Sequence, residues 1–138
     1  MIEKIRTYFK SCPYLKHNKI NVDYLGEQAI GYTLDSIAAP LIIKKYAGGD
    51  TLRQFVFAFN SREPHGADSE QNLQNSSFYE QLAAWLEAQS ENGNLPELDE
   101  NKIAQKIEVL GSGQLIQKDI ASARYQIKCR LIYYQKGY

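Results

Sequence analysis

Apolar and polar side chains alternate along the stretch from Ala123 to Tyr134. A period of two over this length predicts a β-strand with one face toward a core. The predicted inward side chains are Tyr125, Ile127, Cys129, Leu131 and Tyr133, and the polar side chains between them are Gln126, Lys128 and Arg130. Such a strand needs neighbours to pair with and a second layer over its apolar face, so the chain must build a covered sheet.

The first twelve residues predict an amphipathic helix, because Ile2, Ile5, Phe9 and Cys12 recur at helical spacing. Pro13 ends this helix, since proline removes a backbone donor and restricts the residue before it.

A second helix is predicted from Ser77, which forms a capping box with Glu80. Its apolar face is expected to consist of Phe78, Leu82, Trp85 and Leu86. Gly93 is the expected C-terminal cap, and Pro96 prevents the helix from resuming.

Four strands are predicted between the two helices, at residues 20–24, 29–37, 41–46 and 52–59. The glycines of the turn 47–50 provide the positive φ of a tight reversal between the last two. Residues 52–59 are apolar on both sides, which indicates a central strand or one that lies against another subunit. A further strand is expected at 107–116, with a bend or bulge at Gly111–Gly113.

Residues 61–76 are polar and without a clear period. A structureless connection of this length is uncommon inside a compact domain. Two interpretations stay open: a mobile loop, or an extension of the second helix from Asp68 onward.

The predicted fold class is α+β, with a mainly antiparallel sheet of about five to six strands and two principal helices on one face. The length of 138 residues fits a single domain, 1–138. No apolar run is long enough to cross a bilayer, and the charged N-terminus does not resemble a secretory signal, so we expect an intracellular protein without membrane contact.

The net charge is zero, but its distribution is uneven. Residues 61–100 contain nine acidic residues against one basic residue, a balance of −8, and the rest of the chain therefore has a balance of +8. One interpretation is a solvated acidic helix with its loops. The other is a subunit whose acidic and basic sides meet in an assembly.

Residues for catalysis or metal binding do not occur in a recognisable arrangement. Cys12 and Cys129 are isolated and are expected to be buried, and neither His17 nor His65 has a partner at metal-ligand spacing. Gly111-Ser112-Gly113 lies between two β-runs, so it is neither a nucleophile elbow nor a phosphate-binding loop. We therefore expect no catalytic residues, no metal site and no cofactor.

Three stretches together resemble the small minor capsid, or tail-completion, proteins of prophages in Gram-positive bacteria, some of which carry a chloramphenicol-resistance label. These stretches are the opening residues 1–15 with 20–26, the segment 75–87, and the ending 123–133. The chain length and the order of elements are also similar to those of tail-terminator proteins of long-tailed phages.

This resemblance implies a structural role in virion assembly and no enzymatic activity. The expected partners are other copies of the chain, in a ring that is hexameric when assembled, together with the tail tube and head-completion proteins. DNA would pass through the channel without specific binding, and assembly would take place in the cytoplasm of the bacterial host. Two alternatives stay open: another head-completion connector of the stopper type, and a small enzyme or ligand-binding module.

Candidate contact residues lie in the acidic stretch 61–100 and in the final strand. They are Arg62, Asp68, Glu70, Lys128, Arg130, Tyr133 and Tyr134. Tyrosine suits such contacts because it is apolar with a polar tip. The acidic residues of 61–100 would either meet the basic surface of a neighbour or line the channel, where like charge keeps DNA from sticking.

Overall fold

The computed structural model describes residues 1–15, 20–22, 31–64, 69–118 and 122–137. These residues form two helices and six strands in the order helix, four strands, helix, two strands. The elements are α1 (Ile2–Phe9), β1 (Ile20–Val22), β2 (Gly31–Ile37), β3 (Ile42–Lys45), β4 (Thr51–Pro64), α2 (Ser69–Glu91), β5 (Lys102–Lys118) and β6 (Ser122–Gln135).

The six strands form one sheet in the order β1-β2-β4-β6-β5, and β3 pairs with the same edge of β4 as β2 does. All pairings are antiparallel except that of β1 with β2, which is parallel. Strand β4 is therefore central, which confirms the expectation from its apolar character on both sides. The predicted α+β class with a mainly antiparallel sheet is also confirmed.

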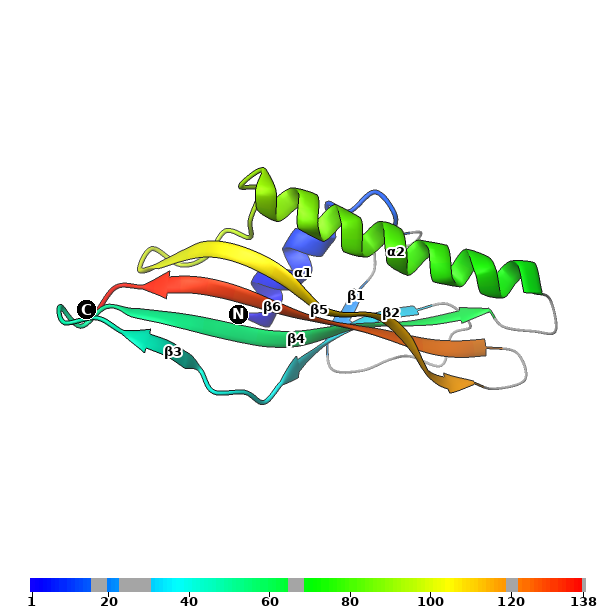
Figure 1. The fold of residues 1–138 in the computed structure, drawn as a ribbon, viewed down its shortest axis with the longest axis horizontal. Coiled ribbons are helices and arrows are strands. Elements are labelled where there is room, and N and C mark those ends of the chain that lie inside the picture. The colour runs from blue at the N-terminus through cyan, green and yellow to red at the C-terminus, as the bar shows by residue number, and fades with distance from the viewer. Residues whose placement is uncertain (16–19, 23–30, 65–68, 119–121, 138) are drawn as a thin grey trace.

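Both helices lie on one face of the sheet (Figure 1). The core between the two layers is rich in aromatic side chains. Phe9 of α1 stacks on Phe59 of β4 with ring centroids 5.3 Å apart, and Leu82 and Leu86 of α2 are fully buried. The inward face predicted for the final strand is confirmed, because Tyr125, Ile127, Cys129, Leu131 and Tyr133 are all buried.

Helical spacing placed Trp85 on the apolar face of α2 together with Leu82. The structure places its ring at the contact between the two helices, 5.5 Å from the ring of Tyr8 and 6.3 Å from that of Phe9. Leu82 belongs to the buried core cluster, and Trp85 packs against its margin.

The bulge predicted at Gly111–Gly113 is confirmed. Strand β5 runs through it, but its register against β6 shifts between Val109 and Gly111 and again between Gly111 and Gln114. Extra residues in one strand of an antiparallel pair bend that strand and increase its twist.

The predicted start of the second helix is wrong. Helix α2 begins at Ser69, so Ser77 lies inside it and does not cap it, and the helix-extension interpretation of residues 61–76 is the correct one. Helix propagation is cooperative, so turns anchored through buried Tyr79 and Leu82 extend into the polar turns before them. At the other end Gly93 has φ +75°, and the N–H groups of Gly93 and Asn94 donate to the carbonyls of Ser90 and Gln89 in a Schellman motif.

No helix in the described ranges combines the length and the apolar character that a membrane span requires.

Candidate functional site on the open sheet face

The sheet face opposite the helices is uncovered at the end where β3 lies. We call this region the open face, and its side chains come from Leu52, Gln54, Val56, Lys106, Glu108, Lys128, Arg130, Ile132 and Tyr134. The register places them together, because Leu52 pairs with Tyr134, Gln54 with Ile132, and Glu108 with Arg130. Directly paired residues point to the same side of a sheet.

Toward β1 the same side of the sheet is buried. Thr33, Ala58 and Asn60 have almost no exposed surface, and the Asn60 amide donates to Asp35 at 2.7 Å and to Thr33 at 3.3 Å. The accessible part of this face therefore begins near Val56 and extends toward β3.

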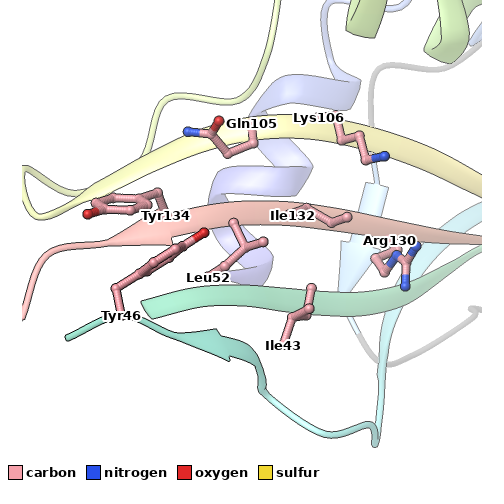
Figure 2. A pocket seen from close by; sticks show the side chains of 8 residues that line it. All are labelled: Ile43, Tyr46, Leu52, Gln105, Lys106, Arg130, Ile132 and Tyr134. Carbon is pink, nitrogen blue, oxygen red and sulfur yellow. The ribbon is translucent and has the colours of Figure 1, made fainter. Parts of the chain in front are cut away.

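A shallow hollow of about 520 Å³ lies on the open face (Figure 2). Its apolar part is formed by strands β3, β4 and β6, and its polar rim by Gln105, Lys106 and Arg130. The full lining is Ile43, Tyr46, Leu52, Gln105, Lys106, Arg130, Ile132 and Tyr134. Ile132 is only 8% exposed, so it forms the floor of the hollow.

The charged groups at the rim satisfy one another. Arg130 Nε donates to Glu108 Oε2 at 3.0 Å, its Nη2 also bonds Glu108, and its Nη1 donates to Gln54 at 3.3 Å. Lys106 Nζ lies 2.5 Å from Glu108 Oε1. The hydrogen bond from Lys106, together with Arg130, lowers the pKa of Glu108 below its ordinary value. The rim is therefore a preformed ion-pair network across β5, β6 and β4.

Asp50 connects Tyr134 and Gly137 to the turn between β3 and β4 through hydrogen bonds. The Tyr134 hydroxyl donates to one carboxylate oxygen of Asp50, and the Gly137 N–H donates to the other at 2.8 Å. The Tyr134 hydrogen bond is the main cause that lowers the pKa of Asp50. The Tyr46 ring lies 5.8 Å from the Tyr134 ring, so the same contacts hold β3 against β6 across the end of β4.

Strand β3 has an exposed apolar surface. All four of its residues are exposed, and the exposed apolar side chains of this segment are Leu41, Ile42, Ile43 and Tyr46. Among the described residues β3 pairs with β4 alone, so its other backbone edge is free. An exposed apolar edge strand is a ready template for another chain.

The structure brings three of the candidate contact residues together on the open face, namely Lys128, Arg130 and Tyr134. Tyr133 lies on the opposite, covered side and is 4% exposed. Arg62 belongs to β4, where it pairs with Gly31 and Arg124, and Glu70 belongs to the first turn of α2. Asp68 lies outside the described residues.

Sequence reasoning missed the acidic and aromatic partners of these residues. Glu108, Asp50 and Tyr46 come from strands and turns distant in sequence, and only the register reveals that they meet Arg130 and Tyr134. The run 41–46 was predicted as a strand, but nothing in its own sequence distinguishes an exposed edge from a buried strand.

The thiols of the chain are not placed for chemistry. Cys12 and Cys129 are both buried, as expected, and burial raises the pKa of Cys129 to about 12. Within the described ranges no three His, Cys, Asp or Glu side chains come together as metal ligands, and both histidines lie outside those ranges. The open face thus contains a hollow with an apolar floor and a rim whose charged groups pair with one another. The exposed apolar strand β3 lies beside this hollow.

No family model matches this chain, and no curated protein matches it.

Proposed function

We propose that the protein is a structural subunit of virion assembly, a tail terminator that forms the ring joining the tail to the head. The observation that carries this proposal is the exposed apolar strand β3 beside the hollow of the open face. The resemblance to tail-completion proteins supplies the biological setting, and the surface supplies a place where a protein partner fits.

The open face suits a protein partner better than a small ligand. The guanidinium of Arg130 already bonds Glu108 and Gln54, so a ligand anion would have to displace an intramolecular partner. Contiguous exposed apolar residues, rimmed by polar ones, are typical of protein interaction sites. The tyrosines of the hollow, Tyr46 and Tyr134, are the residue type enriched at such contacts.

The charge distribution supports contacts between different surfaces of identical subunits. Helix α2 contains four acidic residues and no basic one, and β6 contains Arg124, Lys128 and Arg130 and no acidic one. A ring is built from head-to-tail contacts, in which two different patches of each subunit must be complementary. The acidic helix and the strand with only basic charges lie in separate layers of the fold, as such a contact requires.

The proposal is tested in phage particles induced from the organism that carries the gene. An antibody against the protein is expected to label the joint between head and tail. Deletion of the gene is expected to leave separate heads and tails, with tails of uncontrolled length because nothing caps the growing tube. Infectious particles of normal form without the gene would contradict the proposal.

The same deletion distinguishes a tail terminator from a stopper-type connector. Loss of a stopper would leave tails of normal length, together with heads that fail to retain their DNA.

A further inference from the structure

We propose that copies of this chain join edge to edge, with β3 of one copy pairing with residues 103–106 of β5 in the next. This inference rests on the proposed assembly and assigns the surface that carries it. The two strands form opposite edges of the same end of the sheet. Register links them in one row, in which Lys44 pairs with Leu52, Leu52 with Tyr134, and Tyr134 with Ile103.

The accessible length of the β5 edge matches β3. The Ile107 N–H donates to the Ser90 hydroxyl of α2 at 3.3 Å, so the helix already occupies the edge of β5 at that point. The stretch before it, from Lys102 to Lys106, pairs with β6 alone among the described residues. The Lys102 N–H already donates to the Asp99 carbonyl at 2.9 Å, so residues 103–106 remain as free edge and face a four-residue strand, Ile42–Lys45.

Strand direction favours this pairing. Strands β3, β4, β6 and β5 alternate in direction, because each neighbouring pair is antiparallel. A second copy in the same orientation therefore places its β3 antiparallel to β5 of the first. The joined sheet would continue without a change of pattern, and successive copies would repeat one head-to-tail contact, the kind from which rings are built.

Exposed side chains at the two edges are complementary. Ile43 is 45% exposed and Ile103 is 48% exposed, and each lies on the side of the sheet that bears the open face. The β3 edge also has Lys44 and Lys45 and no acidic residue, a balance of +2. The stretch 97–108, which contains the β5 edge, has four acidic residues against two lysines, a balance of −2, and these lysines, Lys102 and Lys106, already pair with Asp99 and Glu108. Pairing two β3 edges would oppose lysines, and pairing two β5 edges would bring together two stretches that each have a net negative charge, so like charges disfavour both symmetric contacts.

Cysteine cross-linking tests the pairing with the full chain. The native thiols, Cys12 and Cys129, are buried and leave a low background. Mild oxidation of the double variant Ile43→Cys/Ile103→Cys is expected to give a ladder of covalent multimers on a non-reducing gel. Each single variant alone is expected to stay monomeric, and an equal mixture of the two single variants should give only dimers.

The matched control is Ile43→Cys/Leu110→Cys. Leu110 is 49% exposed on the same strand but lies beyond Ile107, so this variant should give no ladder. Charge reversal provides a second test. The variant Lys44→Glu/Lys45→Glu is expected to need an about tenfold higher concentration for half-assembly. A mixture of this variant with Glu97→Lys/Glu100→Lys is expected to assemble again, because the reversed charges attract.

Dimers from either single cysteine variant, or an equal ladder from the Leu110 control, would overturn the edge pairing. Wild-type assembly without cross-linking would overturn it as well and would leave the proposed function standing. Wild-type protein that stays monomeric at every concentration would remove the edge pairing, and head–tail labelling in phage particles would then decide the proposed function independently.

Discussion

The ion pair between Arg130 and Glu108 is expected to stabilise the sheet by about 1 kcal/mol, the upper part of the range for cross-strand and partly exposed pairs. The two residues are direct register partners, and their side chains are 32% and 27% exposed. We place the value near the top of the range because Arg130 donates through two nitrogens to the same carboxylate and through a third to Gln54.

A double-mutant cycle measures this coupling. The variants are Arg130→Gln, Glu108→Gln and the double substitution, which remove the charges. Glu108→Gln keeps the side-chain length, and Arg130→Gln shortens it. Each single variant should lower the free energy of unfolding by about 1–1.5 kcal/mol in urea, equivalent to roughly 4–6 °C in Tm for a chain of this size. The double variant should lose less than the sum of the two, by about 1 kcal/mol.

The pH dependence of the same cycle provides an internal check. The pKa of Glu108 is lowered in the folded protein, so its ionised carboxylate stabilises the fold. This stabilisation is fully present above the unfolded carboxyl pKa of about 4.3 and is lost as the pH falls through the lower folded pKa. The difference in stability between wild type and Glu108→Gln should therefore be largest at neutral pH and vanish in acid. A coupling energy near zero at pH 7, or a difference that grows in acid, would show that this ion pair does not stabilise the sheet.

Three further predictions concern the core, the C-terminal cap of α2 and the buried thiol of Cys129. Leu82→Ala should cost about 3 kcal/mol in urea unfolding because it empties a fully buried site, whereas exposed Glu87→Ala should change stability by less than about 0.5 kcal/mol; equal effects would contradict the burial. Gly93→Ala should cost about 1 kcal/mol because φ is +75°, while Gly48→Ala, with no heavy atom within 4 Å of its added Cβ, should be nearly neutral. The Cys129 thiol, with its pKa raised to about 12, should react with a disulfide reagent at pH 8 only after unfolding, and rapid reaction in the native state would show that the site is open.

Local sequence patterns predicted much of the fold. The alternation in the final strand identified its buried face correctly, since Tyr125 and Tyr133 at its two ends are both buried. The glycines marked a bulge in β5 and the C-terminal cap of α2. These features depend on backbone geometry or period within a few residues, and such information is present in the segment itself.

The start of α2 and the extension of β4 to Pro64 were not predictable in the same way. Residues 61–64 are polar, yet all four pair with β6, and Ser61 and Arg62 also pair with β2 on the other side of β4. Residues 69–76 are helical because the buried turns that follow anchor them. In both cases tertiary contacts decide the structure, and the local pattern contains no trace of them.

The candidate site could be predicted only in part. The alternation placed Lys128, Arg130 and Tyr134 on the outward side of the final strand, where the structure also places them. Their partners Glu108 and Asp50 are brought in by register and by the β3–β4 turn, which depend on the whole sheet. The exposure of β3 likewise depends on which strands pair, because the same apolar residues would suit a buried strand.

We propose that copies of this chain assemble through the edge strand β3. Light scattering across a range of concentrations, on wild type and on Ile43→Asp, tests it most directly. Wild type is expected to pass from the 15.8 kDa monomer to a discrete ring of about 95 kDa, six times that mass. Ile43→Asp is expected to remain monomeric with an unchanged Tm, because Ile43 is 45% exposed. A wild type that stays monomeric, or a variant that assembles equally well, would contradict the claim.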